Sequence, residues 1–270
     1  MTELIAEAGI SHGGVLKTAC TLADIALTAG AETVKYQTYV PAKLLRRRAP
    51  DRPLLEKLAL SFKDTIKLSK HCNDIGIEFM STPGDLDSLK FLVEECGVQR
   101  VKIGSDDLTY KPLVEAAFAT GKPVILSTGM ATLSEIRQAV GDKTEFKRLT
   151  LLHCVSLYPC PAVMANVRAI TTLQDEFCCA VGFSDHTHLF IAAHLAMALG
   201  ATVIEKHFCP DDYNGPDAEV SLTPVQLKAF VQSIQHCEMI LGSGIKEPSE
   251  QEAAMIPLLR KGKDGLRGLG

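Results

Sequence analysis

The chain has 270 residues, of which 46% are hydrophobic and 22% are charged, and its formal net charge is −4. These values are typical of a globular protein with a substantial core. They show no overall basic bias toward nucleic acid or an anionic membrane, so a phosphate group would have to be bound by a local site. The sequence starts without a basic and apolar leader, and no segment approaches the ~18 apolar residues of a membrane span. We therefore expect a cytoplasmic protein that binds neither nucleic acid nor a membrane.

The cysteines support the same compartment. There are nine of them, an odd number, and none forms a C-x-x-C pair. Several lie inside apolar runs, which is typical of buried, reduced thiols.

Apolar runs rich in Val, Ile and Leu recur eight times, and each is followed by a segment of helical character. The predicted strands cover residues 4–10, 33–39, 78–83, 100–105, 123–128, 149–156, 180–186 and 202–208. The predicted helices cover residues 16–29, 64–75, 86–96, 113–120, 133–140, 167–176, 189–199 and 224–241. This alternation favours an α/β protein with a (β/α)8 TIM barrel over a doubly wound sheet, which usually has fewer strands. We expect a barrel domain over residues 1–260 and a short flexible tail over residues 261–270.

One stretch interrupts this alternation between the second strand and its helix. Residues 41–53 begin and end with proline and contain the run Arg46, Arg47 and Arg48. We expect a solvated loop here. The alternative is a lid over an anionic substrate.

Polar residues recur at the C-terminal ends of the predicted strands, where a barrel of this kind builds its active site. Charged side chains in apolar runs have a high desolvation cost unless they are paired or used, so their recurrence predicts a polar cavity at one end of the barrel. The residues at these strand ends are Glu7, Lys35, Gln37, Thr82, Lys102, Ser105, Ser127, Thr128, Ser156, Tyr158, Ser184, Asp185, His186, Glu205, Lys206 and His207.

The lysines and hydroxyl groups of this set suit a small, multiply charged anion such as a phosphorylated carboxylic acid. The two ammonium groups supply charge, and the hydroxyls supply directional donors. Any one of these Ser or Thr side chains could instead hydrogen-bond to nearby backbone in a turn or a helix cap. Lys35 and Lys102 have a second alternative, as Schiff-base nucleophiles.

Two histidines suggest a metal site. Period-2 alternation puts Ser184 and His186 on one face of their strand, and Glu205 and His207 on one face of the next. If the two strands are neighbours, two imidazoles converge beside a carboxylate, which gives a partial coordination sphere for a divalent ion with open positions. The alternative is a pair of histidines satisfied by hydrogen bonds inside the sheet.

A set of short motifs runs in order along almost the whole chain. They are IAEAG at 5–9, VKYQT at 34–38, STP at 81–83, VKIGS at 101–105, KPVILSTGM at 122–130, LHC at 152–154, YP at 158–159, SDHT at 184–187, IEKHF at 204–208 and GPD at 215–217. Together they resemble the sialic acid synthase (N-acetylneuraminate synthase) family, which includes the legionaminic and pseudaminic acid synthases. These transferases condense phosphoenolpyruvate with N-acetylmannosamine or related amino sugars to form nine-carbon ulosonic acids.

The resemblance implies a (β/α)8 barrel and a divalent ion, Mn²⁺ or Mg²⁺, bound by His186 and His207 as a Lewis acid for the sugar aldehyde. It implies that Glu7 handles the proton of the attacking water. Further residues near the sugar would be Glu205, Tyr158 and Asp217. The substrate-binding residues would be Lys35, Gln37, Thr82, Lys102, Ser105, Ser127, Ser156 and Ser184.

The chain also departs from the family pattern. Family members usually continue into an antifreeze-like domain that reaches the partner's barrel in the dimer, and no stretch of this sequence matches that domain. We therefore expect the catalytic barrel only, either as a homodimer or together with a separate antifreeze-like protein. Departures at residues 11–14, Gly84 and Asp107 fall on the expected acceptor side, whereas the phosphoenolpyruvate side is intact.

Three functional hypotheses follow. The first is a metal-dependent synthase that joins phosphoenolpyruvate to an N-acetylated amino-sugar aldehyde. The second is a related condensing enzyme for another aldehyde or a sugar phosphate, with residues 46–48 as the phosphate contact. The third is a silent barrel that serves as a scaffold or as a subunit dependent on an antifreeze-like partner. The charged residues kept at the strand ends argue against a silent barrel.

Overall fold

The computed structural model describes residues 2–141 and 146–268. By its internal contacts the chain divides into two compact units, one that extends to Glu238 and one that begins at Met239. The first unit contains the strands, and the second contains the end of α10 and helix α11 (Glu250–Leu259). The division into a barrel over residues 1–260 and a tail over 261–270 stays a prediction. None of the helices in the described residues is both long enough and apolar enough to span a bilayer.

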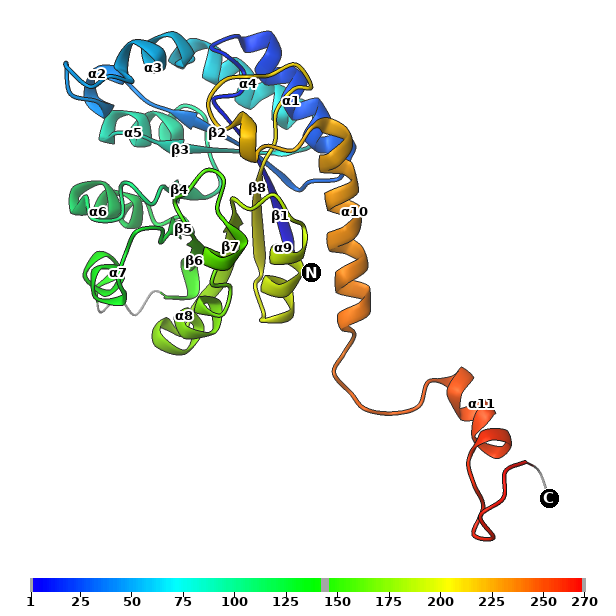
Figure 1. The fold of residues 1–270 in the computed structure, drawn as a ribbon. Coiled ribbons are helices and arrows are strands. Elements are labelled where there is room, and N and C mark those ends of the chain that lie inside the picture. Colours follow the sequence, from blue (N-terminus) through cyan, green and yellow to red (C-terminus); the bar gives the residue numbers. More distant parts are fainter. Residues whose placement is uncertain (1, 142–145, 269–270) are drawn as a thin grey trace. The chain divides into compact units, whose positions relative to one another are not determined.

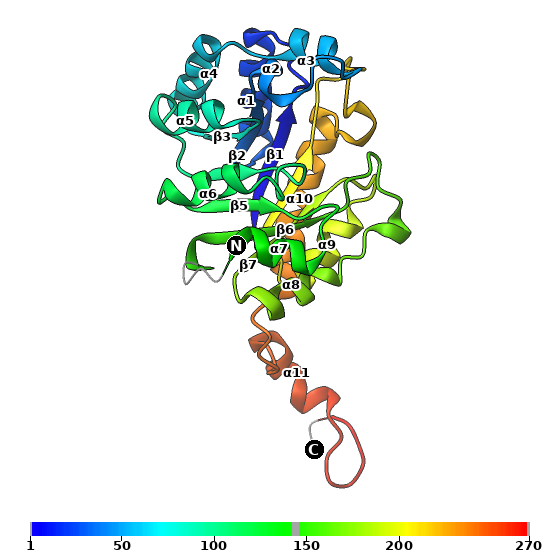
Figure 2. The same cartoon turned by 90° about the vertical axis from the view of Figure 1, so that its left-hand side faces the viewer.

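Parallel strands in the described residues form one sheet in the order β3-β2-β1-β8-β7-β6-β5-β4. The edge strands β3 and β4 lie beside each other, so the sheet is nearly closed into a barrel (Figures 1 and 2). The strands are β1 (Glu3–Gly9), β2 (Thr33–Thr38), β3 (Glu78–Pro83), β4 (Val101–Ile103), β5 (Val124–Ser127), β6 (Leu149–Cys154), β7 (Ala180–Asp185) and β8 (Val203–His207). The predicted TIM barrel is confirmed.

Each strand is followed by a helix on the outside of the barrel (Figure 2). These helices are α1 (Leu16–Ala29), α4 (Phe62–Ile75), α5 (Leu86–Glu94), α6 (Lys111–Ala119), α7 (Leu133–Val140), α8 (Ala169–Phe177), α9 (Ile191–Ala198) and α10 (Pro224–Leu241). Three-residue 3₁₀ helices cover Phe146–Arg148, Ala162–Met164 and Ala218–Val220. Gly30 and Gly76 end α1 and α4 with φ of 95° and 85°, a left-handed conformation that favours glycine.

The stretch of residues 41–53 differs from its prediction as a solvated loop. Helices α2 (Pro41–Leu44) and α3 (Arg52–Leu58) lie at its two ends, so the loop prediction is wrong there. Each helix has a proline in its first two positions, where the fixed φ and the missing N–H favour a helix start. The three arginines at 46–48 lie between these helices and are exposed.

The main core lies between the strands and the helices that cover them. Helix α1 shows how it is built, because Ala19, Leu22, Ala23 and Ala26 recur at helical spacing and are fully buried. A buried leucine of this kind contributes about 1.5–3 kcal/mol to folding.

The inside of the barrel is filled in layers. At the N-terminal ends of the strands, Arg100 donates hydrogen bonds to Glu3 (2.6 Å) and Glu78 (3.0 Å). The next layer is apolar and consists of Ile5, Met80, Ile125, Leu152 and Val203. These two layers fill the barrel from the N-terminal ends of its strands. Polar groups therefore have room to form a site only at the C-terminal ends of the strands.

Candidate active site

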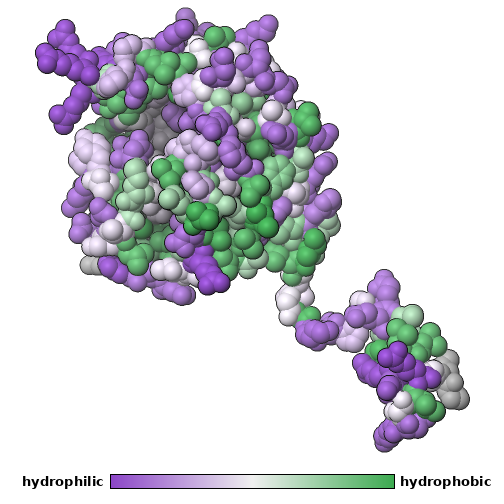
Figure 3. Space-filling view, viewed as in Figure 1, coloured by the Kyte–Doolittle hydropathy of each residue, from purple (hydrophilic) through white to green (hydrophobic). Residues whose placement is uncertain are grey.

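A cavity of about 320 Å³ opens at the C-terminal ends of the strands. The space-filling view shows a hollow on this face of the barrel (Figure 3). The structure brings together in this cavity every residue for which a catalytic, substrate-binding or metal-binding role is predicted. These residues are Glu7, Lys35, Gln37, Thr82, Lys102, Ser105, Ser127, Ser156, Tyr158, Ser184, His186, Glu205, His207 and Asp217. Their individual roles stay predictions.

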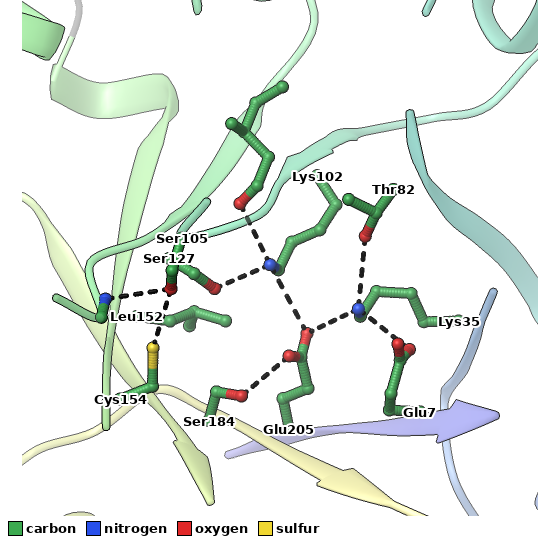
Figure 4. Close-up of polar contacts among 12 residues, drawn as sticks. Glu7, Lys35, Thr82, Lys102, Ser105, Ser127, Leu152, Cys154, Ser184 and Glu205 are labelled. Carbon is green, nitrogen blue, oxygen red and sulfur yellow. Dashed lines mark hydrogen bonds and ion pairs between the residues drawn. The ribbon is translucent and has the colours of Figure 1, made fainter. Parts of the chain in front are cut away.

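A chain of buried charges lies at the centre of the cavity (Figure 4). The ammonium nitrogen of Lys35 on β2 lies 2.9 Å from Glu7 Oε2 on β1 and 3.5 Å from Glu205 Oε2 on β8. It also donates a hydrogen bond to the hydroxyl of Thr82, at 3.3 Å. The order of neighbouring strands β3, β2, β1 and β8 makes this convergence possible.

The second lysine approaches the same carboxylate from the other side. The ammonium nitrogen of Lys102 lies 4.0 Å from Glu205 Oε2 and donates a hydrogen bond to Ser127 at 2.7 Å. The Ser184 hydroxyl donates to the other oxygen of Glu205 at 2.9 Å. Glu205 therefore lies between two ammonium groups and accepts a hydrogen bond as well.

The two carboxyl groups respond differently to these surroundings. Burial raises the pKa of Glu7 to about 7, because the ammonium of Lys35 offsets only part of the desolvation cost. Burial alone would raise the pKa of Glu205 too, but Lys102 and Lys35 lower it to about 2. Glu7 can therefore exchange a proton near neutral pH, whereas Glu205 stays ionised.

The two lysines also differ. Burial lowers the pKa of Lys102. The same burial acts on Lys35, but the carboxylates of Glu205 and Glu7 outweigh it and raise the pKa of Lys35. The protonated amino group of either lysine places positive charge in a poorly solvated space, where an anion is bound more strongly than at an exposed surface.

A group of small residues lies beside Lys102. The backbone N–H of Gly129 donates to the Ser105 hydroxyl at 3.0 Å, and that hydroxyl lies 3.2 Å from the thiol of Cys154. A Cβ atom at Gly129 would lie 2.3 Å from the Ser156 hydroxyl, so only glycine lets the backbone approach this closely. The result is a compact set of hydroxyl and backbone donors next to an ammonium group.

The two histidines converge as expected, because β7 and β8 are neighbours and Ser184 pairs with Glu205. The ring centroids of His186 and His207 are 5.4 Å apart. Burial lowers the pKa of both imidazoles, so they are neutral at pH 7. His207 Nδ1 lies 4.0 Å from Asp217, and the ring of Tyr158 packs 4.1 Å from His186.

The donor atoms of these histidines fit a divalent ion as two of its ligands. His186 Nδ1 lies 2.8 Å from the carbonyl oxygen of Val155, to which it must donate, so its Nε2 is left as the acceptor. A hydrogen bond from the second ring nitrogen to a carbonyl is the usual support of a metal-binding histidine. Within residues 2–141 and 146–268 no group of three or more His, Cys, Asp or Glu is arranged for a metal. Water or substrate oxygens would therefore complete the coordination.

Not every polar strand end belongs to the cavity. Thr128, Asp185 and Lys206 do not line it, and the interpretation of these three as part of a polar cavity is wrong. Side chains alternate along a strand, so Asp185 and Lys206 point away from the side on which their histidine neighbours lie. Thr128 instead donates a hydrogen bond to the carbonyl of Leu152 at 2.9 Å.

Sequence reasoning missed several residues of the cavity wall. They are Tyr39, Leu44, Gly104, Asp106, Met130 and Cys154. Cys154 ends β6 and shares a face with Leu152, so the strand-end pattern could have found it. Leu44 gave no such signal, because it comes from the helix α2 in a stretch expected to be a loop.

Comparisons with known proteins agree with this architecture. The profile of the NeuB family matches residues 22–246. The N,N'-diacetyllegionaminic acid synthase of Legionella pneumophila is 39% identical, over 96% of this chain and 78% of that protein. The N-acetylneuraminate-9-phosphate synthase of Drosophila melanogaster is 32% identical, over 87% of this chain and 68% of that protein.

A solved structure agrees in fold as well as in sequence. The N-acetylneuraminic acid synthetase of Leptospira borgpetersenii, crystallised with citrate, superposes with a TM-score of 0.89 at 36% identity and covers 94% of this chain and 90% of that one. These matches confirm the predicted relationship to the sialic acid synthases, and with it the expectation of an enzyme. The chain belongs to the NeuB family.

Proposed function

We propose that this chain condenses phosphoenolpyruvate with an N-acetylated amino-sugar aldehyde, such as N-acetylmannosamine or a related acetamido sugar, to give a sialic-acid-like nonulosonic acid and phosphate. The observation that carries the proposal is the convergence of Lys35 and Lys102 on one buried cavity that also contains a carboxyl group poised near neutral pH. The names of the Legionella and Leptospira relatives support a synthase of this class.

The lysine side of the cavity suits phosphoenolpyruvate, which carries a phosphate and a carboxylate. Lys102 with Ser127 offers charge and a hydroxyl at one end. Lys35 with Thr82 offers the same pair at the other end. In the free enzyme the carboxylate of Glu205 lies between the two amino groups and favours the charged form of both lysines.

The reaction forms a carbon–carbon bond between C3 of phosphoenolpyruvate and the aldehyde carbon of the open-chain sugar. Water then adds at C2, and the C–O bond to phosphate breaks to leave the keto acid. Glu7 takes the proton from the attacking water, since its pKa near 7 lets it accept and release a proton at neutral pH. Tyr158 and Asp217 flank the histidines on the side where the sugar would lie.

A divalent ion, Mn²⁺ or Mg²⁺, would be held by His186 and His207, and when bound it supplies a Lewis acid for the sugar's carbonyl oxygen. The chain's own contribution is to keep both imidazoles neutral and close together. Burial lowers the pKa of each ring, and the Val155 carbonyl orients His186.

Two alternatives have specific support. A phosphorylated sugar as acceptor is favoured by the exposed arginines at 46–48 and by the name of the Drosophila relative. A Schiff-base aldolase is favoured by the lowered pKa of Lys102. We rank both below the proposed function. A Schiff-base aldolase has no use for the histidine pair, and the Legionella synthase is more similar to this chain than the Drosophila synthase is.

The test is phosphate release from phosphoenolpyruvate by the purified full chain with Mn²⁺. N-acetylmannosamine, a diacetamido-trideoxyhexose and N-acetylmannosamine 6-phosphate are compared as acceptors. Release that requires one of the unphosphorylated sugars supports the proposal and identifies the acceptor. Covalent trapping of substrate on a lysine by borohydride, with no effect of a chelator, would instead identify an aldolase. A protein that binds no phosphoenolpyruvate would contradict the donor assignment.

A further inference from the structure

A buried ion pair lies directly behind the histidine pair, on the opposite side of the same two strands. Asp185 on β7 and Lys206 on β8 are register partners, and their side chains are fully buried. The ammonium nitrogen lies 3.2 Å from Asp185 Oδ2. Each of the two residues immediately precedes a cavity histidine in the sequence, yet neither lines the cavity.

Both charged groups hold the backbone of the same residue, Thr187. Asp185 Oδ1 accepts a hydrogen bond from the backbone N–H of Thr187 at 2.8 Å. Lys206 donates a hydrogen bond to the backbone carbonyl of Thr187. Thr187 directly follows His186 and is itself buried. The ion pair therefore fixes the main chain on the C-terminal side of this histidine.

The remaining bonds of His186 complete this support. Its carbonyl oxygen accepts a hydrogen bond from the backbone N–H of Cys160 at 2.8 Å. Its imidazole Nδ1 donates to the Val155 carbonyl at 2.8 Å. With the main chain held at Asp185 and Thr187, the ring has little freedom to turn, and its Nε2 stays on the side of Ser184, at 3.5 Å.

Stability alone does not account for this pair. Two charges that are removed from water lose much hydration energy, and an apolar pair of similar size often stabilises a core equally well or better. The pair does, however, supply two hydrogen bonds of fixed direction to Thr187, which apolar side chains cannot supply.

We propose that Asp185 and Lys206 are positioning residues that orient His186 toward His207, an inference that rests on the proposed function for its catalytic meaning. By holding the main chain at Thr187 they keep the imidazole where its Nδ1–H reaches the Val155 carbonyl, which leaves Nε2 free to bind a ligand. The pair acts on the active site only through His186 and contacts neither substrate.

The experiment replaces the pair in the full-length chain by Asp185→Leu with Lys206→Met. Three properties are measured: the melting temperature, the imidazole ¹⁵N signals of His186 and His207 without metal or substrate, and the affinity for Mn²⁺ by calorimetry. The matched control is Arg100→Met, which breaks an ion cluster at the opposite end of the same barrel, far from the histidines.

The double variant is expected to fold, to shift the His186 signals away from the Nδ1–H pattern and to bind Mn²⁺ about 10- to 100-fold more weakly, as is common when the support of a metal-binding histidine is lost. Arg100→Met is expected to lower the melting temperature while the histidine signals and the Mn²⁺ affinity stay at their wild-type values. A folded double variant with wild-type signals and wild-type affinity would overturn the proposal.

A second variant covers the case in which the double variant does not fold. Asp185→Asn keeps an acceptor for the Thr187 N–H but leaves Lys206 without its counter-charge. A loss of Mn²⁺ affinity that exceeds the loss in Arg100→Met supports positioning, and a loss no greater than that contradicts it. The ¹⁵N signals need neither substrate nor activity. If the wild-type chain released no phosphate with any acceptor, the proposed function would fail, and the signals would still decide whether the pair orients His186.

Discussion

Glu7 and Glu205 share the ammonium group of Lys35, at 2.9 and 3.5 Å, yet their pKa values move in opposite directions. The difference arises because Glu205 also faces Lys102 and accepts a hydrogen bond from Ser184. The pKa of Glu7 is raised first by burial and also by the charge of Glu205, and Lys35 with a smaller effect of Lys102 offsets only part of this. Two carboxyl groups separated in this way are typical of a site in which one exchanges protons and the other remains an anion.

The first prediction concerns the pH dependence of the reaction. If Glu7 must be ionised to accept a proton, kcat/KM for phosphoenolpyruvate is expected to rise as the pH increases through about 7, the pKa of Glu7 in the free enzyme. Glu7→Gln should lower kcat by about 10²- to 10⁴-fold and abolish this rise. The measurement is phosphate release across this pH range, with Glu115→Gln on the exposed face of α6 as the control. An unchanged rise in the Glu7 variant would exclude Glu7 as the titrating base.

The second prediction concerns stability. The pKa of Glu7 is raised from 4.5 to about 7 on folding, so the folded state binds the proton more tightly, and the contribution of Glu7 to the free energy of unfolding falls as the pH rises from about 4.5 to about 7. Glu205, whose pKa is lowered to about 2, contributes stability above pH 4.5 that is lost as the pH falls toward 2. Glu7→Gln should remove this contribution, which has a slope of at most about 1.4 kcal/mol per pH unit. Asp107, whose pKa burial also raises to about 7, keeps its own contribution in the variant.

Urea unfolding at several pH values provides this measurement. The acid side should be unaffected by Glu7→Gln, since Glu205 accounts for it. If the free energy of unfolding declined above pH 4.5 equally in both proteins, another group would be responsible.

The third prediction concerns the histidine pair. His186→Ala and His207→Ala should each weaken Mn²⁺ binding and reduce activity, while circular dichroism shows an intact fold. A chelator should inhibit the wild-type enzyme reversibly. The control is His236→Ala on the exposed side of α10. Wild-type Mn²⁺ affinity in both cavity variants would exclude these imidazoles as metal ligands.

The fourth prediction separates the two classes of acceptor. The arginines at 46–48 are exposed, two residues beyond the cavity residue Leu44. For an unphosphorylated sugar, replacing all three by serine should change KM for the sugar by less than about twofold, because exposed charges contribute little to the binding of a neutral ligand. A sugar phosphate would lose charge-assisted hydrogen bonds, and its KM would rise by about tenfold or more.

The fifth prediction concerns the packing of the barrel interior. A Cβ atom at Gly182 on β7 would lie 2.5 Å from the carbonyl oxygen of Val203 and 2.6 Å from the Leu152 side chain. Gly182→Ala should therefore lower the free energy of unfolding by about 1–3 kcal/mol. Ala180→Ser, at the exposed start of the same strand, should change it by less than about 0.5 kcal/mol. Urea unfolding of both variants checks the difference.

Much of the fold could be predicted because local and global signals agree. The helix over residues 16–29 has a clear apolar face and a terminal glycine, and its predicted bounds match those of α1. The strands could be recognised because they are buried on both faces and read as continuous apolar runs. The cavity residues followed from a general property of barrels, that polar strand ends meet at one pole.

The parts that could not be predicted depend on three-dimensional contacts. Alternation along the strand separates Asp185 from His186, but the ion pair of Asp185 with Lys206 behind the histidines depends on the distance between their side chains. The contribution of Leu44 required knowledge that α2 packs near the strand ends. The opposite pKa shifts of Glu7 and Glu205 depend on the distances to two lysines, which no spacing in the sequence specifies.

The barrel is closed between β3 and β4 by contact and not by a main-chain ladder. The hydrogen-bonded ladder ends at these two strands in the described residues, and β4 is only three residues long. The side chain of Arg100, the residue before β4, donates hydrogen bonds to Glu78 at the start of β3. Separating β3 from β4 would therefore break side-chain contacts such as the Arg100–Glu78 ion pair, and no main-chain ladder of the described residues. The segment after β4 contains the cavity residues Ser105 and Asp107, so one part of the cavity wall is built on the strand that lacks a ladder on this side.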